Sequence, residues 1–218
     1  MGSVRPRATL PSEFAVFPLE GAMLLPRGRL PLNIFEPRYL AMVEDALGAG
    51  RLFGMIQPDS AAPPGATGPA LFRVGCLGRI SQFSETEDGR FLITLTGVIR
   101  FEVQEELAPR RGYRRVRAAF DRFVCDLRAD PEPIGLPRES ILGALRTYFA
   151  RRALEANWEV IGRLPDETLV VTLAMSCPFS PAEKQAILEA GGEAARAAAL
   201  LALLQMGAAE EPPGRAVS

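Results

Sequence analysis

The sequence of 218 residues contains no histidine, a single lysine (Lys184) and only three cysteines. The absence of histidine excludes Ser-His and Cys-His nucleophiles and every histidine-ligated metal site. Cys76, Cys125 and Cys177 lie far apart, and no CxxC pair occurs. This spacing indicates buried free thiols in a reducing compartment rather than a disulfide framework.

Nucleotide-binding motifs are also missing. A Walker A loop requires a Gly-Lys pair, but Lys184 follows Glu183, and no GxGxxG occurs. Ser180 and Lys184 do not predict a catalytic dyad, because Ser180 is the expected N-cap of a helix that would hold Lys184 on its surface. Glu85, Glu87 and Asp88 indicate a solvated turn, since a calcium site normally needs about six or more oxygen ligands. We therefore expect no catalytic residue, cofactor or metal, and a protein that is not an enzyme.

Long apolar runs are absent as well. The longest, near "LVVTLAM" and "AAALLALL", are well short of the roughly 20 residues that span a bilayer. The first residues lack the apolar region of a secretory signal. We expect a soluble, cytoplasmic protein without membrane contacts. The oligomeric state stays open between a monomer and a weak dimer.

The order of secondary-structure signals predicts an α+β protein. Apolar residues make up 48% of the chain, which is enough for a sizeable core. We expect a flexible leader over residues 1–13, a strand-rich part over 14–128 with one early helix at about 37–47, a helical part over 134–206, and a disordered tail over 207–218. Strands first and helices afterwards argue against a βαβ sheet.

The segment "LPLNIFEPRYL" predicts a junction between a strand and that early helix. Pro37 suits the first helical position, where its missing N–H costs nothing. Glu36 stands just before it, near the positive end of the helix dipole. A second start signal, Ser180 followed by Pro181 and Glu183, predicts a capping box.

The strongest strand signal lies in the middle of the chain. Asp88-Gly89 is a good hairpin turn between two apolar runs. Phe91, Ile93 and Leu95 alternate with Leu92, Thr94 and Thr96, which indicates a strand buried on one face. Gly97 permits a bend before the strand resumes, and residues 113–127 are expected to form a further strand.

A basic stretch follows, with five arginines in eight residues around one tyrosine: Arg110, Arg111, Tyr113, Arg114, Arg115 and Arg117. A basic stretch with an aromatic residue can bind phosphate or single-stranded nucleic acid. Alternation along a strand also fits a solvated face, which Glu102, Glu105 and Glu106 could neutralise. The net charge of −1 weakens the nucleic-acid interpretation.

The segment "FPLEGAMLLPRGRLPLNIFEPRYLAMVEDAL" resembles the start of the Lon protease N-terminal domain, also called the LON substrate-binding domain. "VGCLGRI", "DGRFLITLTGVIRFEV" and "LVVTLAMSCPFSPAEKQAILE" are similar to later parts of that family. The resemblance runs from about Phe14 to Met206, although Asn33 stands where many relatives have histidine. Complete Lon proteases continue into an ATPase module and a Ser-Lys proteolytic domain. The resemblance therefore implies a stand-alone, PUA-like mixed β-barrel followed by a C-terminal helical bundle.

The resemblance also implies a non-enzymatic module that binds unfolded polypeptide or a partner protein, without ATP hydrolysis or proteolysis of its own. Candidate contacts are Phe35, Glu36, Arg38, Tyr39 and Arg100. Each also has a structural interpretation: Phe35 in the core, Glu36 and Arg38 at the helix start, Tyr39 packed on the strands and Arg100 paired on its strand. A PUA-like RNA-binding protein that uses the stretch from Arg110 to Arg117 is one alternative function. An enzyme of unknown type is another.

Overall fold

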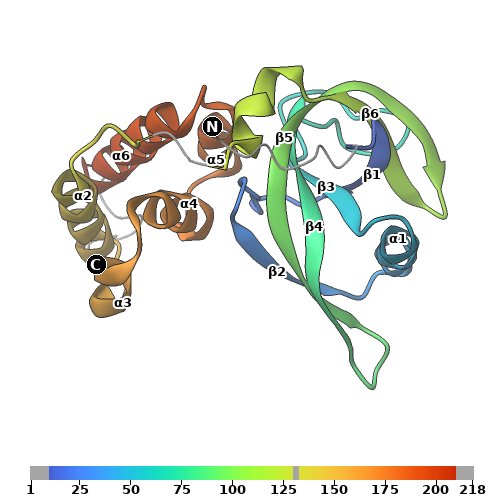
Figure 1. Ribbon diagram of the computed structural model, residues 1–218, viewed down its shortest axis with the longest axis horizontal. Helices are drawn as coiled ribbons and strands as arrows, with labels where there is room; N and C mark the ends of the chain where they lie inside the picture. Colours follow the sequence, from blue (N-terminus) through green and yellow to red (C-terminus); the bar gives the residue numbers. More distant parts are fainter. Residues whose placement is uncertain (1–9, 130–132, 210–218) are drawn as a thin grey trace, which may run out of the picture. The chain divides into compact units, whose positions relative to one another are not determined.

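The computed structural model describes residues 10–129 and 133–209. The chain divides into two compact units, Met1–Asp130 and Pro131–Ser218. Among the described residues, the first unit, which we call the strand unit, contains the six strands, and the second, the helical unit, contains five helices (Figure 1). The α+β class expected from the sequence is confirmed.

The strand unit is built on one mixed sheet with a helix and a 3₁₀ turn. Its elements are β1 (Glu13–Pro18), β2 (Arg29–Ile34), α1 (Pro37–Gly48), β3 (Leu52–Ile56), β4 (Val74–Glu85), β5 (Phe91–Arg110), β6 (Tyr113–Ala119) and η1 (Asp121–Leu127). β1 and β3 are parallel, whereas the other strand pairs are antiparallel. The strand expected over residues 113–127 ends at Ala119, and residues 121–127 form a 3₁₀ turn instead, in which Phe123 is buried.

The hydrogen-bonded strands form a closed circuit. The sheet order is β2-β5-β4-β3-β1-β6, and β6 also pairs with β5. The ring therefore runs β5-β4-β3-β1-β6 and back to β5, while β2 pairs with the first half of β5. The 20-residue β5 takes part in three pairings, and its residues facing the core, among them Ile93, Leu95, Ile99 and Phe101, are buried.

Glycines allow two close approaches in this sheet. A Cβ on Gly97 would lie 2.0 Å from the carbonyl oxygen of Leu25, and one on Gly75 would lie 2.4 Å from the ring of Phe101. Both separations are impossible for a real side chain, so only glycine fits. At Gly97, where a bend was expected, the register between β4 and β5 shifts by one residue: Leu77 is opposite Ile99, whereas Gly78 is opposite Gly97. β5 continues through this irregularity.

α1 begins as the sequence indicates. Pro37 is its first residue, and Glu36 is the N-cap position. Its residues Tyr39, Met42 and Val43 form part of its buried face. β2 therefore leads into α1 within three residues of the chain.

The helical unit contains α2 (Arg138–Arg151), α3 (Trp158–Arg163), α4 (Asp166–Ser176), α5 (Pro181–Glu189) and α6 (Glu193–Ala209). The capping box at Ser180 is confirmed, since its side chain accepts from Glu183 N and the Glu183 side chain accepts from Ser180 N. α6 continues to Ala209, so a disordered tail from residue 207 is wrong for its first three residues. Residues 1–9 of the expected leader and 210–218 of the expected tail lie outside the described residues.

η1 is held to β5 by a buried ion pair. Arg100 Nη2 lies 2.8 Å from Asp126 Oδ1, Arg100 Nε donates to Asp126 Oδ2 at 2.9 Å, and the Arg100 backbone N–H donates to the same oxygen at 3.0 Å. The Arg100 side chain is 1% exposed, and its guanidinium lies 4.5 Å from the centre of the Phe123 ring.

Replacement of Asp126 by alanine should therefore destabilise the strand unit severely. The change leaves the Arg100 charge buried without its carboxylate, at a cost of about 3–5 kcal/mol. Urea denaturation measures the free energy of unfolding, and Asp126→Asn serves as a milder variant that keeps the side-chain shape. Arg90→Ala is the control, because its exposed pair with Asp88 should contribute almost nothing. Equal stabilities of the Asp126→Ala and Arg90→Ala variants would contradict this assignment.

Candidate functional site

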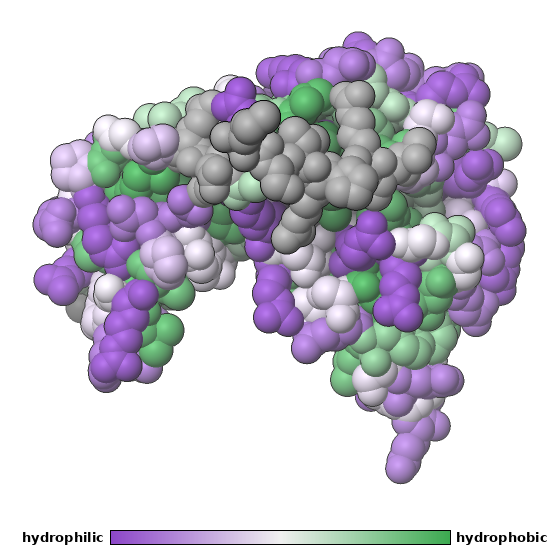
Figure 2. Space-filling view, viewed as in Figure 1, coloured by the Kyte–Doolittle hydropathy of each residue, from purple (hydrophilic) through white to green (hydrophobic). Residues whose placement is uncertain are grey.

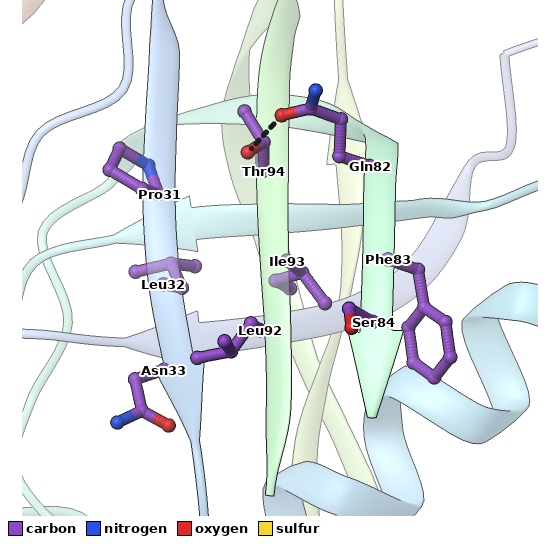
Figure 3. A pocket seen from close by; sticks show the side chains of 9 residues that line it. All are labelled: Pro31, Leu32, Asn33, Gln82, Phe83, Ser84, Leu92, Ile93 and Thr94. Atoms are coloured by element: carbon purple, nitrogen blue, oxygen red, sulfur yellow. Dashed lines mark hydrogen bonds between the residues drawn. The ribbon is translucent and has the colours of Figure 1, made fainter. Parts of the chain in front are cut away.

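A concave surface lies across three adjacent strands of the sheet. Its volume is about 610 Å³. Three consecutive residues of each strand line it: Pro31, Leu32 and Asn33 of β2, Gln82, Phe83 and Ser84 of β4, and Leu92, Ile93 and Thr94 of β5 (Figure 3). We call this surface the hollow.

The register of the strands arranges these residues in rows. Asn33 is opposite Leu92, which is opposite Ser84, and Pro31 is opposite Thr94, which is opposite Gln82. Residues directly opposite one another share a face of a sheet. These two rows therefore lie on one face, and the row of Leu32, Ile93 and Phe83 lies on the other.

The hollow is uncharged. None of its nine residues carries a formal charge. Its polar groups are neutral amides and hydroxyls, and Thr94 Oγ1 donates to Gln82 Oε1 at 2.8 Å (Figure 3). Such a surface can offer apolar contact and neutral hydrogen bonds, but no counter-charge for phosphate or carboxylate.

Large apolar side chains are exposed in and beside the hollow. Leu92 is 46% exposed and Phe83 42%, while Phe35, one residue beyond the end of β2, is 63% exposed. Figure 2 shows hydrophobic residues gathered at the lower end of the strand unit, above the hydrophilic tip of the β4–β5 hairpin. By the register, Leu92 and Phe83 lie on opposite faces of the sheet, so they are separate exposed apolar groups. Exposed apolar groups of this kind can mark an interaction surface.

The candidate contacts from the sequence fall in different environments. Phe35 is exposed, so its expected place in the core is wrong. Glu36 and Arg38 form an ion pair of 2.8 Å with each other at the helix start. Tyr39 is buried against Phe17, with ring centres 4.2 Å apart, and burial raises its pKa.

Arg100 is the most deeply buried of these candidates. Its bidentate pair with Asp126 leaves it 1% exposed. It therefore offers no surface to a ligand. Of the five candidate contacts, Phe35 has the largest exposed apolar surface.

The arginine-rich stretch is engaged in ion pairs. Each of its arginines has a carboxylate partner: Asp45 for Arg110, Glu44 and Asp45 for Arg111, Glu106 for Arg114, Glu13 for Arg115, and Glu13 and Glu105 for Arg117. Glu105 and Glu106 were expected to neutralise the stretch, but Glu13, Glu44 and Asp45 come from distant parts of the sequence. The stretch is thus a salt-bridged face of the strand unit.

Tyr113 is committed to the same network. Its hydroxyl donates to Asp45 Oδ2 at 2.6 Å, and its side chain is buried. Burial and then this hydrogen bond raise the pKa of Tyr113 to about 12. The hydrogen bond from Tyr113 is the largest cause that lowers the pKa of Asp45. The ring is therefore not available for stacking on a base.

Other reactive groups are buried or used structurally. Lys184, expected on a helix surface, is buried, and burial lowers its pKa. Burial also raises the pKa of the Cys177 thiol to about 12, so this thiol is unreactive at neutral pH. Within the described residues, no three acidic or cysteine side chains converge as a metal site would require. No helix in residues 10–129 and 133–209 is long and apolar enough to cross a membrane.

The sequence contained one signal for the hollow. Leu92 belongs to the outward-facing residues of β5, together with Thr94 and Thr96. A large apolar side chain is not expected on a face exposed to solvent. The remaining lining residues come from β2 and β4 and meet Leu92 only through the strand register.

Comparison with known proteins identifies relatives along most of the chain. The family model of the ATP-dependent protease La (LON) substrate-binding domain matches residues 13–206. Lon protease 2 of Sorangium cellulosum (strain So ce56) is 28% identical over 194 residues, which cover 87% of this chain and 24% of that protein. Lon protease 2 of Myxococcus xanthus is 22% identical over 196 residues, covering 89% and 24%. The chain spans about a quarter of the length of these curated relatives.

Two solved structures share the fold. The Lon N-terminal domain protein from Xanthomonas campestris matches with a TM-score of 0.58 and 24% identity, over 87% of this chain and 97% of that one. The N-terminal domain of the Mycobacterium avium complex Lon protease matches with a TM-score of 0.56 and 16% identity, over 91% and 98%.

The commitment of Tyr113 to Asp45 can be tested by titration. Tyr113→Phe removes the hydrogen bond that contributes most to the low pKa of Asp45, so this pKa should rise toward its ordinary value. A lowered carboxyl pKa stabilises the fold above the pKa of the unfolded chain, and this stability is lost as pH falls through the folded pKa. The variant should therefore lose less stability on acidification than the wild type.

Carbon-13 NMR of the carboxyl groups measures the pKa of Asp45 directly. Tyr39→Phe is the matched control, because the causes that shift the pKa of Asp45 do not include Tyr39. An Asp45 pKa that is the same in Tyr113→Phe and in the wild type would rule out the proposed role of the hydroxyl.

Proposed function

Because the chain belongs to the family of the ATP-dependent protease La (LON) substrate-binding domain, we propose that it is a module that binds polypeptide at the hollow. The ligand is an unfolded segment or an extended part of a partner protein. The module recognises the bound polypeptide but does not itself hydrolyse ATP or cleave peptide bonds.

We also propose that the strand unit is the PUA-like barrel that the family resemblance implies, and that residues 134–206 are the helical bundle that follows it. The closed circuit from β5 through β4, β3, β1 and β6 supports the barrel. Two compact units with a boundary near residue 130 support the division of the chain.

The observation that carries the binding function is the exposed apolar surface around Leu92 and Phe35. Both side chains are about half exposed or more, and the adjoining hollow is uncharged. An unfolded segment differs from a folded surface mainly in the apolar side chains and main-chain groups that it exposes. The face of the sheet that carries Leu92 provides a complement to both, since it combines leucine and proline with neutral amides and hydroxyls.

The absence of catalysis is supported by the chemistry of the described residues. Ser180 Oγ accepts from Glu183 N as a helix cap, and Lys184 is buried. The sequence contains neither histidine nor a Gly-Lys pair. These side chains therefore provide no activated nucleophile and no phosphate-binding loop.

The RNA-binding alternative gains no support from the arginine-rich stretch. A phosphate would have to compete with the carboxylates of Glu13, Glu44, Asp45, Glu105 and Glu106, which already pair with its arginines. We therefore do not propose nucleic acid as the ligand.

Substitution of the exposed apolar side chains should weaken polypeptide binding. Leu92→Ser and Phe35→Ser each remove apolar area that the ligand would cover, and each should cost about 1–2 kcal/mol of binding free energy, or roughly a tenfold loss in affinity. The ligand is a fluorescently labelled protein that is reduced and carboxymethylated to keep it unfolded, and anisotropy measures its affinity.

Val124→Ser is the matched control. Val124 is 44% exposed in η1 and lies outside the hollow, so its replacement should leave the affinity unchanged. Equal losses for Val124→Ser and Leu92→Ser would indicate non-specific apolar binding and contradict the site. The unfolding free energies of all three variants should match that of the wild type, since surface changes usually alter it by less than about 0.5 kcal/mol.

The salt dependence of binding provides an independent test. An uncharged site should bind the same unfolded protein with nearly equal affinity at low and high ionic strength. A ligand held by the arginine-rich stretch would instead lose affinity steeply, because bound counterions are released. A steep loss with salt would refute binding at the hollow and favour the arginines.

A further inference from the structure

β2 lies at the end of the sheet order. It pairs with β5 on one side only. In Figure 3, β5 lies between β2 and β4, so β2 forms one side of the three strands that make the hollow. A strand in this position presents main-chain N–H and C=O groups to whatever lies beside it.

Two hydrogen bonds establish which residues of β2 face that edge. Gly97 N donates to Gly28 O at 2.9 Å, so the odd-numbered residues of β5 direct their main-chain groups toward β2. Thr94 O instead accepts from Ser81 Oγ on β4 at 3.0 Å, as expected for the even-numbered residues.

The register then assigns the residues of β2. Leu30, Leu32 and Ile34 are opposite Leu95, Ile93 and Phe91 and face β5. Arg29, Pro31 and Asn33 direct their main-chain groups away from the sheet. Pro31 agrees with this assignment, because a proline inside a sheet is tolerated where its missing N–H faces outward.

The outer edge of β2 has no backbone partner among the described residues. β2 pairs with no strand other than β5, and none of the backbone hydrogen bonds in turns, loops and caps involves Arg29, Pro31 or Asn33. The edge thus offers two donors, the N–H groups of Arg29 and Asn33, and three carbonyl acceptors. It lies directly beside the two rows of the hollow that begin at Pro31 and Asn33.

We propose that the bound polypeptide adds to the sheet as an extra strand along the outer edge of β2. This inference rests on the proposed function and specifies the ligand: an extended segment whose side chains opposite Pro31 and Asn33 are uncharged. Those side chains extend the rows that run through Thr94 to Gln82 and through Leu92 to Ser84. Main-chain hydrogen bonds supply affinity that does not depend on sequence, while the hollow selects the side chains.

Pro31 argues that the occupant is not a second copy of this chain. A foreign strand opposite Pro31 lacks one ladder hydrogen bond. If two copies of β2 paired about a two-fold axis, each copy would place a Pro31 in the ladder, and the ladder would lack two hydrogen bonds. The edge is therefore better suited to a different polypeptide than to its own β2.

Backbone N-methylation of a ligand tests strand addition directly. The probe is an eight-residue peptide of alternating valine and threonine, joined to a fluorophore by a flexible Gly-Ser linker. A methyl group is placed on one backbone nitrogen at a time, and anisotropy measures binding to the full chain. Methylation of residues whose N–H faces β2 should weaken binding at least fivefold to tenfold, since it removes one hydrogen bond. Methylation of the intervening residues should have little effect.

The outcomes separate the two proposals. An alternating pattern of losses supports strand addition. Equal affinity for every methylated peptide, with binding still sensitive to Leu92→Ser, overturns strand addition but leaves the hollow as the binding site. Failure of the unmodified peptide and of the unfolded protein to bind overturns both.

A protein variant provides the converse test. Pro31→Ala adds the missing donor to the edge, and the affinity for the unmodified peptide should increase about threefold to tenfold. Pro64→Ala, which changes an exposed proline between β3 and β4, should not alter the affinity. Sedimentation velocity measures the fraction of Pro31→Ala that forms dimers. The peptide affinity is then calculated from the concentration of monomer. An unchanged or weaker affinity of the monomeric variant would argue against the proposal.

Discussion

The hydrogen bonding of β5 to three other strands is the constraint on which the strand unit depends. Its first half lies between β2 and β4, and its second half pairs with β6 and closes the circuit. Gly97 lies between the two halves, where the carbonyl of Leu25 allows no side chain. Arg100, three residues later, fixes η1 through Asp126. Because one strand provides both the core and the floor of the hollow, the position of Leu92 is set by the residues packed beneath it.

The two halves of β5 present different chemistry to the solvent. The outward residues of the first half, Leu92 and Thr94, are uncharged. The second half carries Glu105 and Glu106, which join the arginines of β6 in ion pairs. Ion pairs are thus concentrated where strands and α1 hold one another together, whereas the residues that line the hollow, between β2 and β4, are uncharged. This separation favours apolar recognition at one end of the sheet without attraction of polyanions to it.

Local signals in the sequence were sufficient for several elements. Pro37 at the start of α1, Asp88-Gly89 in the hairpin and the capping box at Ser180 are determined by a few adjacent residues. The 3₁₀ turn at residues 121–127 was not predictable in this way, because it is held by the ion pair between Asp126 and Arg100. Arg100 lies in β5, far from the turn in sequence. Burial of Lys184 has the same origin, since its neighbours come from the packing of the helical unit. The hollow depends on the register of three strands, which no single segment of the sequence encodes.

The pairing of β1 with β6 also has a consequence for how the chain folds. Glu13 and Arg117, which form an ion pair in this ladder, are 104 residues apart in sequence. Contacts between such distant segments carry a large loop-closure entropy and slow the search for the native state. During synthesis, β1 emerges first but lacks its antiparallel partner until Ala119 has left the ribosome. We therefore expect the N-terminal strand to be among the last parts of the sheet to become protected, although it is the first to be made.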